Sequence, residues 1–435
     1  MDVLIYTEVE NREMDAACLI KAELEKRGYT ATIERYNRVC DSGNMLIYNP
    51  KVVVLPWLYD ETFLFNFINN NRHGKTRFVN LQSEQILSEN FIKNNYHMPK
   101  GRCKDEYHLS WGKVTTERFL NVGILSDHIW ECGNINMDFN SETFCEVYKN
   151  KQQLSEQFGL NVGQKWCLFI SSFTHPSMSK EEKTSYITRF PFLKDFVDIS
   201  TKSQEMLCWW FEKFAVDHPE VEFIYRPHPV ELRNNMVMEL NQRISNFHVI
   251  SDYSVRQWIK VCEKNTTWFS TSIADAYFQQ KSCAILRPIA IPKSADCELF
   301  YDCSSISQYE EFEKYVMCND AETVFPISKL QITAYYGEQK CGTSYKKFCD
   351  YIVDLLKKNG NADVIEYKCN ALSRIRRNMI SYIFQVNKKV SLSFMFTHTN
   401  TFLHDQLEEK HKSQRKCNVY INAMESILKK ILTEE

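Results

Sequence analysis

The segment Tyr225–Glu231 (YRPHPVE) contains an arginine and a histidine set among two prolines. Proline fixes its own backbone and restricts the residue before it, so Arg226 and His228 extend from a stiff corner. A guanidinium offers a two-pronged donor for phosphate, and an imidazole can donate a hydrogen bond or a proton to it. The spacing fits a phosphate site and a structural turn, in which His228 caps a helix or packs in an interface, about equally well.

A run of hydroxyl side chains occurs within the segment Trp268–Asp275 (WFSTSIAD). The run consists of Ser270, Thr271 and Ser272. We expect a strand to end here and a helix to begin, and amides and hydroxyls at a helix N-terminus bind anions without a glycine loop. One hydroxyl would serve as an ordinary N-cap, whereas three exceed that need. Ser171 and Ser172 form a further hydroxyl pair after a predicted strand.

In the first half of the chain, Glu84 follows the segment Arg77–Leu81 (RFVNL), which we expect to be a strand. A carboxylate at the carboxyl end of a strand can act as a general base on an acceptor hydroxyl, or it can cap the next helix. We rank Glu84 first as candidate catalytic base and His108 second. Asp127 and His128 are the remaining polar candidates, and structural roles are the simpler interpretation for both.

Several common cofactor motifs are absent from the sequence. It contains no G-x-G-x-x-G, no G-x-x-x-x-G-K-[ST], no D-x-D and no Cys/His set with zinc spacing. These absences argue against a dinucleotide fingerprint, a P-loop and a protein-bound metal. A phosphate would have to be bound by side chains and helix N-termini, and we expect neither a metal nor another cofactor.

Predicted strands and helices alternate along most of the chain, which indicates an α/β protein with parallel sheets. The predicted strands are 3–9, 30–36, 51–56, 77–81, 107–111 and 129–132, then 166–173, 221–225, 247–250, 267–269 and 283–286. We divide the chain into two Rossmann-like domains (1–150 and 151–360) and a helical tail (361–435). We also expect a helix over 141–158 and a long insertion over 174–201. Ligands of such sheets bind outside the carboxyl ends of the strands.

The composition is that of an ordinary globular protein. The chain has 435 residues, a net charge of −2, 44% hydrophobic and 25% charged residues, whereas a nucleic-acid-binding protein would normally be more basic. The N-terminus MDVLIYTEVE lacks the features of a secretory signal, and no apolar stretch reaches the roughly 18 residues of a membrane span. We expect the 16 cysteines to be reduced and mostly buried. A cytoplasmic location is therefore predicted.

The motifs resemble those of bacterial surface-polysaccharide transferases. RPHP after a strand, followed later by FSTSIAD, is similar to the nucleotide-binding half of capsular Kdo transferases, sialyl- and polysialyltransferases, and CDP-glycerol glycerophosphotransferases. Four further segments occur in the order found in surface carbohydrate biosynthesis proteins: NLQSEQ (80–85), SWG (110–112), CGNINMDF (132–139) and LFISSF (168–173). Ile135 and Asn136 replace the Pro-Arg of the usual family form GNPRFD, so the role of that arginine is not carried over. The resemblance covers residues 75–290.

This resemblance implies a GT-B fold, in which two Rossmann-like domains face each other across a cleft and the second binds most of an activated donor. It implies that the donor phosphate is contacted by His228, Ser270, Thr271 and Ser272. Fixed hydrogen-bond donors stabilise the charge that a leaving phosphate gains in the transition state. Arg226, His228 and a helix N-terminus would then replace a metal.

The predicted function is a metal-independent glycosyltransferase. It would move a sugar from a CMP-, CDP- or UDP-linked donor to a surface polysaccharide or glycolipid, with no nucleic-acid partner. A polyol-phosphate transferase that uses a CDP-alcohol shares both motifs, and a nucleotide-sugar epimerase shares the fold. The alternative without catalysis is a degenerate GT-B scaffold in an assembly complex.

The tail contains an apolar segment, Met379–Val386, between basic residues. These basic residues are Arg374, Arg376, Arg377, Lys388 and Lys389. Such a helix can lie on an anionic membrane surface, which would place the protein at the cytoplasmic membrane face. We favour packing of the apolar side against the first domain, because amphipathic helices of soluble proteins mostly face a core.

Overall fold

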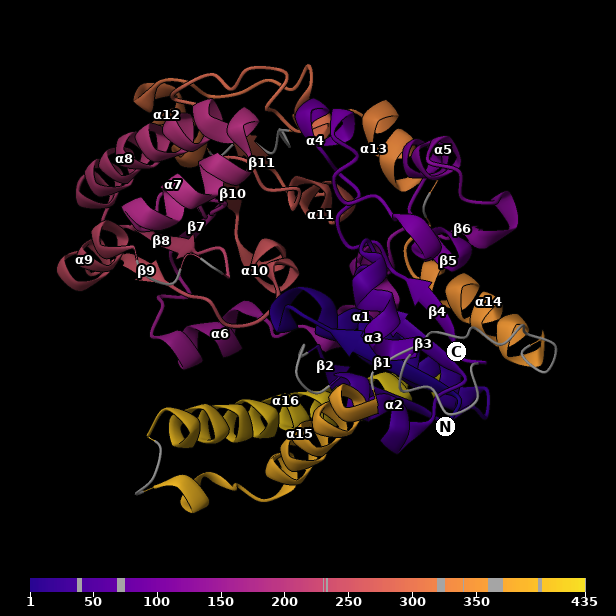
Figure 1. Ribbon diagram of the computed structural model, residues 1–435. Coiled ribbons are helices and arrows are strands. Elements are labelled where there is room, and N and C mark those ends of the chain that lie inside the picture. Colours follow the sequence, from indigo (N-terminus) through magenta and orange to yellow (C-terminus); the bar gives the residue numbers. More distant parts are fainter. Residues whose placement is uncertain are drawn as a thin grey trace. The chain divides into compact units, whose positions relative to one another are not determined.

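The computed structural model describes residues 1–36, 41–68, 75–229, 231, 234–318, 325–338, 340–358, 371–397 and 401–434. These residues form two compact units, each with its own parallel sheet (Figure 1). Unit 1 comprises residues 1–85, 97–139 and 336–435, and unit 2 comprises residues 86–96 and 140–335. The expected domain division at 150 and 360 stays a prediction, and the compact units are each built from separate segments of the chain.

Unit 1 contains a six-stranded parallel sheet in the order β2-β1-β3-β4-β5-β6. Its strands are β1 (Val3–Thr7), β2 (Ala31–Arg35), β3 (Val52–Leu55), β4 (Arg77–Asn80), β5 (Tyr107–Ser110) and β6 (Ile129–Glu131). The central strands VLIYT and VVVL are buried throughout, as continuous apolar runs in a parallel sheet require. The helices of this unit are α1 (Glu10–Lys26), α2 (Asp41–Tyr48), α3 (Glu61–Ile68), α5 (Lys113–Asn121), α14 (Ser344–Lys358), α15 (Ala371–Lys389) and α16 (Thr401–Glu434).

Unit 2 contains a five-stranded parallel sheet in the order β11-β10-β7-β8-β9. Its strands are β7 (Lys165–Ile170), β8 (Val221–Arg226), β9 (Phe247–Val249), β10 (Lys264–Thr267) and β11 (Cys283–Ile285). The chain runs outward from β7 to β9 and then returns to β10 on the other side of β7, which is the Rossmann pattern of strand order. The helices are α4 (Glu89–Lys93), α6 (Lys151–Phe158), α7 (Lys180–Arg189), α8 (Lys194–Asp217), α9 (Asn235–Arg243), α10 (Val255–Val261), α11 (Ile273–Phe278) and α12 (Tyr309–Met317), with α13 (Lys329–Tyr336) at the passage to unit 1.

Two sequence-based expectations for local structure are wrong. The helix expected over 141–158 begins only at Lys151, because the side chain of Asn150 caps it there by accepting from the Gln153 amide at 2.9 Å. The segment 174–201 is largely helical, with α7 and the start of α8 inside it, and its being an insertion stays a prediction. The strand expected over 267–269 ends at Thr267.

A buried carboxylate joins the two ends of unit 1. Asp138 accepts hydrogen bonds from the backbone amides of Gly342 at 2.9 Å, Ser344 at 3.2 Å and Tyr345 at 2.7 Å, at the start of α14. Burial raises the pKa of Asp138 to about 6, although these bonds act in the opposite direction. Helices α14 and α16 also pack against α1, so the C-terminal helices belong to the unit formed by the first six strands.

The cysteines that the structure describes are free thiols and most are buried, as predicted. Within the described residues, no helix combines the length and the apolar composition that a membrane crossing demands.

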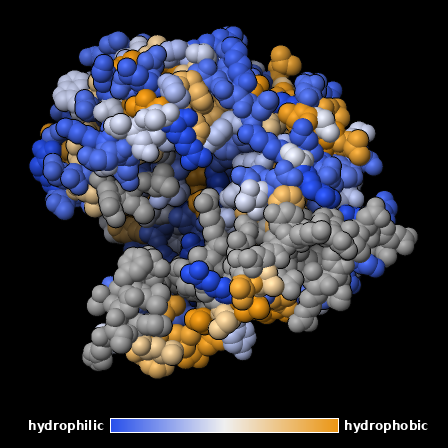
Figure 2. Space-filling view, in the orientation of Figure 1, coloured by the Kyte–Doolittle hydropathy of each residue, from blue (hydrophilic) through white to orange (hydrophobic). Residues whose placement is uncertain are grey.

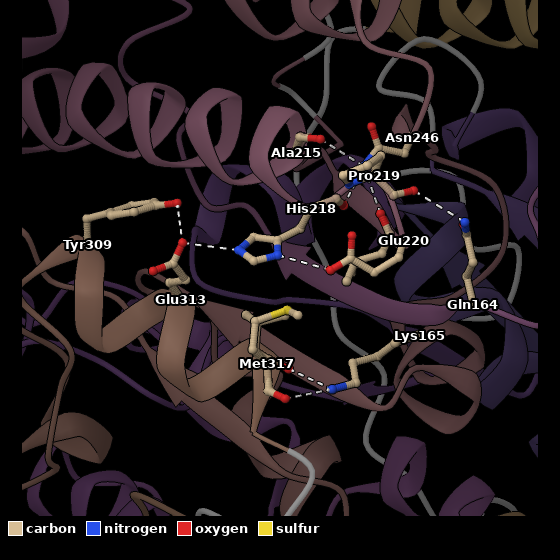
Figure 3. Close-up of polar contacts among 12 residues, drawn as sticks. Gln164, Lys165, Ala215, His218, Pro219, Glu220, Asn246, Tyr309, Glu313 and Met317 are labelled. Carbon is tan, nitrogen blue, oxygen red and sulfur yellow. Dashed lines mark hydrogen bonds and ion pairs between the residues drawn. The ribbon is translucent and has the colours of Figure 1, made fainter.

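Figure 3 shows a cluster of polar contacts in unit 2. His218, at the end of α8, lies 3.1 Å from Glu313 of α12 through Nε2 and 3.1 Å from Glu220 through Nδ1. Burial alone would lower the pKa of His218, but the hydrogen bonds to the two carboxylates raise it above its usual value. The cluster therefore ties α8 to α12 most strongly when the imidazole is charged.

We expect this cluster to make the stability of unit 2 depend on pH. Because the folded-state pKa of His218 is raised, its contribution is complete below the unfolded pKa of about 6.5 and is lost as pH rises through the folded value. His218→Gln should therefore lower the free energy of unfolding by about 0.5–1 kcal/mol more at pH 6 than at pH 8. Urea unfolding measures this difference, with His404→Gln in α16 as the control. An equal cost at both pH values would contradict the role of the imidazolium.

Candidate functional site

The three phosphate-binding candidates of the second half follow three adjacent strands. Ile170, the last residue of β7, is paired with Arg226 of β8 on one side and with Thr267 of β10 on the other. The strands are parallel, so the segments after them leave the sheet at one edge. The Ser171 amide donates to the Arg226 carbonyl at 3.0 Å, and the Thr267 hydroxyl donates to the Ile170 carbonyl at 3.0 Å.

This edge is the topological switch point of the sheet. The chain leaves β7 in one direction toward β8 and returns on the other side to β10. Open α/β sheets bind ligands outside the carboxyl ends of the strands at such a point. The structure therefore brings together the RPHP segment, the hydroxyl pair after β7 and the hydroxyl run after β10 at the expected place.

Glu231 organises the loop that carries RPHP. Its side chain is 2% exposed and accepts from the hydroxyls of Ser171 and Tyr225, from Gln204 at 3.1 Å and from the His228 amide at 3.2 Å. Burial raises the pKa of Glu231, although the hydrogen bonds act in the opposite direction. These bonds connect β7, β8, α8 and the loop. Sequence analysis assigned no role to Glu231, and its signal was only its place three residues after the histidine.

The guanidinium of Arg226 forms hydrogen bonds with the backbone of the protein. It is buried and donates to the backbone carbonyls of Asp252, at 2.7 Å, and Tyr253. Burial lowers the pKa of Arg226 to about 10, so the group stays charged at neutral pH. Carbonyl oxygens carry no formal charge, and Asp252 offsets the positive charge in part. Arg226 thus holds the β9–α10 loop in this structure and contributes positive potential at the edge, rather than presenting an open two-pronged donor.

His228 lies partly exposed on the loop after β8. A second histidine, His175, follows β7 in the sequence THP and is mostly buried against the rings of Tyr186 and Phe196. Burial, together with the charges of Lys183 and His228, lowers the pKa of His175 to about 4. His175 is therefore neutral near pH 7. Sequence analysis missed it, although a second His-Pro pair after a strand was a usable signal.

The hydroxyl run adopts the turn that precedes α11. The Ser270 hydroxyl donates to the Ser272 hydroxyl at 3.1 Å and accepts from the Ser272 amide at 3.3 Å, so it provides the local cap. Thr271 is exposed. The hydroxyl of Ser172 is buried and has no hydrogen-bond partner. A buried unpaired hydroxyl at a strand end is costly, and a bound ligand or water could satisfy it.

Two buried ion pairs support this turn. Arg287 forms a two-pronged pair with Asp296 at 3.0 Å and donates to the Trp268 carbonyl at 2.8 Å. Arg256 lies 3.8 Å from Asp275 of α11, and burial raises the pKa of Asp275 to about 6. The hydroxyl run is therefore fixed on both sides by charged groups that point inward.

In unit 1, most polar side chains of the NLQSEQ segment form hydrogen bonds that connect the ends of neighbouring strands. Asn80 donates to Gln82 at 2.7 Å, Ser83 donates to the Pro56 carbonyl at 2.9 Å, and Gln85 donates to the Leu109 carbonyl at 2.9 Å. These bonds fix the turn after β4. The side chain of Glu84 is 42% exposed and sits on this rigid turn.

Glu84 is paired with a cation that sequence analysis missed. Arg12, in the first turn of α1, lies 2.5 Å from Glu84 and 3.1 Å from Glu13. Burial would lower the pKa of Arg12, but the two carboxylates raise it above its usual value. The phenol hydroxyl of Tyr59 is also buried close to Glu84, and burial and the Glu84 charge raise the pKa of Tyr59 well above its usual value. Arg12 and Tyr59 are distant from Glu84 in sequence, so spacing could not reveal them.

The other base candidates have structural surroundings. His108 is fully buried within β5, with its ring nitrogens 3.1 Å from Asn80 and 2.9 Å from the Cys103 carbonyl. Burial lowers the pKa of His108 to about 3, which makes it a weak base at neutral pH. Asp127 and His128 precede β6 and thus lie at its amino end, opposite the edge at which ligands bind.

Among the residues that the structure describes, no three His, Cys, Asp or Glu side chains are grouped as a metal site would require. Metal independence stays a prediction.

Two Rossmann-like units with parallel sheets, followed by C-terminal helices, define the GT-B class of fold. No family model and no curated protein matches the chain. Several solved structures do. The MnaA protein of S. aureus, in a co-structure with UDP, matches with a TM-score of 0.53 at 12% identity over 84% of this chain and 100% of that chain.

Two further solved structures are similar over comparable lengths. UDP-GlcNAc 2-epimerase from Neisseria meningitidis bound to UDP-GlcNAc has a TM-score of 0.52 at 13% identity, over 81% of this chain and 100% of that chain. A variant of the wall teichoic acid polymerase TagF with CDPG has a TM-score of 0.54 at 12% identity, over 82% of this chain and 89% of that chain. At these identities the likeness establishes the fold, so the fold prediction is confirmed.

We expect the Glu231 carboxylate to be required for the stability of the edge. Glu231→Gln keeps the shape but turns one acceptor oxygen into an amide that cannot accept from the surrounding hydroxyls and amides. The substitution should cost about 1–3 kcal/mol in the free energy of unfolding. Urea unfolding checks this value, with the exposed Glu239→Gln of α9 as the matched control. A cost no larger than that of the control would show that Glu231 does not organise the loop.

Proposed function

We propose that the protein is a glycosyltransferase of surface polysaccharide biosynthesis that binds a nucleotide-activated sugar in unit 2. The observation that carries this proposal is the meeting of three segments with phosphate-binding side chains at the switch point of the unit 2 sheet. The solved structures of the same fold that contain UDP, UDP-GlcNAc or CDPG support a nucleotide-linked donor. The donor would be CMP-, CDP- or UDP-linked, and the acceptor a polysaccharide or glycolipid.

In this proposal the edge stabilises the leaving phosphate. The bond between the sugar and the phosphate breaks, and the phosphate oxygen gains negative charge. His228 and the hydroxyls of Ser172, Thr271 and Ser272 would donate hydrogen bonds to that charge, which fixed donors stabilise without rearrangement. Ser171 and Ser270 would act by position, since the first is bonded to Glu231 and the second caps the turn. Arg226 would supply positive potential from behind the loop.

We propose Glu84 as the base that deprotonates the acceptor hydroxyl, if the sugar is transferred with inversion. The carboxylate pairs with Arg12, and the hydrogen-bonded NLQSEQ turn fixes its position. His108 is the weaker candidate because its ring is buried and neutral. A retaining reaction would leave Glu84 with a positioning role only.

Two other reactions have a specific observation in their favour. The likeness to UDP-GlcNAc 2-epimerases favours a nucleotide-sugar epimerase, and the likeness to TagF with CDPG favours a transferase of a polyol phosphate from a CDP-alcohol. Product analysis separates them from the glycosyltransferase. We further propose that the protein acts in the cytoplasm without a metal or other cofactor.

The central test is a donor panel with the full chain. CMP, CDP, UDP and GDP are compared by thermal shift, because selective binding to the folded state raises the melting temperature. Nucleotide-sugars and CDP-glycerol are then assayed with EDTA present. His228→Ala should lower nucleotide release about 10²–10³-fold while the melting temperature changes little. His218→Gln, at the opposite end of the β-strands, is the control.

Each outcome of the panel has a defined meaning. Epimerised nucleotide-sugar without nucleotide release would replace the transferase proposal by the epimerase. Release of CMP from CDP-glycerol alone would favour the polyol-phosphate transferase. Activity that EDTA abolishes and Mg²⁺ restores would contradict metal independence, and the absence of any turnover or nucleotide shift would favour a scaffold.

The role of Glu84 is tested separately. Glu84→Gln keeps the size of the side chain and removes the charge that pairs with Arg12. We expect sugar transfer to fall about 10²–10⁴-fold, as the loss of a general base does, with little change in nucleotide binding. Glu89→Gln on α4 is the matched control, since Glu89 pairs with Lys93 on the surface. Transfer within a few-fold of wild type would show that Glu84 is not the base.

A further inference from the structure

The helix α15 and the short turn after it carry exposed apolar side chains. The exposed fractions lie between 45% for Ile383 and 77% for Leu372. The full set is Leu372, Ile375, Met379, Tyr382, Ile383, Val390, Phe394 and Met395. Figure 2 shows hydrophobic residues gathered in the region where α15 and α16 lie in Figure 1. The expectation that this side packs against the first domain is therefore wrong for Met379, Tyr382 and Ile383, while the side chains of Ile380 and Phe384 lie outside the described set.

The exposed residues of α15 form one stripe. Leu372, Ile375, Met379, Tyr382 and Ile383 follow one another at spacings of three, four, three and one. At about 100° per residue, these positions lie within roughly a quarter to a third of the helix circumference. A single apolar face of this size on a helix surface marks an interaction site rather than scattered exposure.

Polar contacts connect α15 to α2 and α16. The side chain of Gln385 donates to that of Asn44 in α2. Asn387 donates to the Leu407 carbonyl of α16 at 2.9 Å and accepts from the Leu392 amide at 2.7 Å. Because these contacts hold the helix against α2 and α16, the apolar stripe is presented outward on a fixed support.

The charged side chains of α15 are all basic. Residues 371–397 contain five basic residues and no Asp or Glu. Arg376 and Lys389 are exposed, and their positions on the helix border the apolar stripe on its two sides. Long basic side chains at the border of an apolar face reach phosphate groups while the apolar residues enter the acyl boundary.

We propose that α15 and the turn Ser393–Phe396 form a membrane-surface anchor that binds lipid bilayers rich in anionic headgroups. The apolar stripe would enter the boundary between headgroups and acyl chains, with Tyr382 at the level where aromatic side chains are favoured. A second copy of the chain fits the stripe less well, because two such helices would bring together five positive charges from each with no acidic residue to offset them. This inference goes beyond the proposed reaction and does not depend on it.

The test is co-sedimentation of the full chain with vesicles that contain no glycolipid. Vesicles of phosphatidylcholine mixed with an equal amount of phosphatidylglycerol should carry the protein into the pellet at low salt, and vesicles of phosphatidylcholine alone should not. The triple variant Met379→Ser, Tyr382→Ser, Ile383→Ser should bind about a hundredfold more weakly. Conversion of the five basic residues to Gln should weaken binding about tenfold or more and remove its salt dependence.

The matched control changes exposed apolar residues elsewhere. Met206→Ser, Trp209→Ser and Val216→Ser on α8 remove a similar amount of exposed apolar surface and should leave vesicle binding unchanged. Hydrogen exchange of residues 371–397 gives a readout that needs no substitution. Anionic vesicles should slow exchange in α15, and unchanged exchange with no pelleting would overturn the proposal.

One result would assign the stripe to a different partner. Light scattering that shows a dimer of the wild type, lost in the triple variant, together with no vesicle binding, would make the stripe a contact between two copies and overturn the membrane assignment. The vesicles contain neither the sugar donor nor the acceptor. The membrane proposal can therefore be contradicted without affecting the glycosyltransferase proposal, and the glycosyltransferase proposal can be contradicted without affecting the membrane proposal.

Discussion

A carboxylate without access to water governs the arrangement of unit 2. Ionised or not, a buried carboxyl group needs hydrogen-bond partners, and Glu231 obtains them from β7, β8, α8 and its own loop. Because those donors come from four places, Glu231 connects the described part of the loop after β8 to the sheet and to α8. The position of His228 follows from this constraint, and the hydroxyls after β7 are aligned with it because Ser171 belongs to the same network.

The charged residues near the candidate site divide into those that hold the backbone and those that are available to a ligand. Arg226, Arg256 and Arg287 are all buried, and each is bonded to carbonyls or carboxylates of unit 2. In unit 1, Glu84 is partly exposed, whereas other polar side chains of the same turn form hydrogen bonds within the protein. A site of this kind is rigid before a ligand arrives, which suits the stabilisation of charge in a transition state.

The strands and their order of occurrence could be predicted because parallel, buried strands appear as short apolar runs such as KVVVLP and WCLFI. The meeting of three motifs at one edge could also be predicted, since each follows a strand and parallel strands end together. The hydrogen bonds and ion pairs of individual side chains could not be predicted. Whether Arg226 is open or bonded depends on Asp252 and Tyr253, and the partner of Glu84 lies on α1, far away in sequence.

Errors in local structure have similar causes. The polar segment 141–158 has helical composition throughout, but only Asn150 provides the cap from which a stable helix starts. The apolar side of α15 was expected to face a core. This expectation was wrong because helical periodicity cannot distinguish a buried apolar face from a solvent-exposed one. In the structure, Gln385 and Asn387 contact α2 and α16, partners that are remote in the sequence.

The carboxylate of Asp138 has a consequence for synthesis of the chain. Its partners, the amides of Gly342, Ser344 and Tyr345, leave the ribosome only after all of residues 140–335. Unit 2 has all its segments outside before unit 1 does, and domains fold as units during translation. The six strands made first must therefore wait, with α1 uncovered by α14 and α16, until the last helices arrive. Unit 1 is therefore completed only after unit 2, and until then its strands and α1 lack the contacts that the later helices supply.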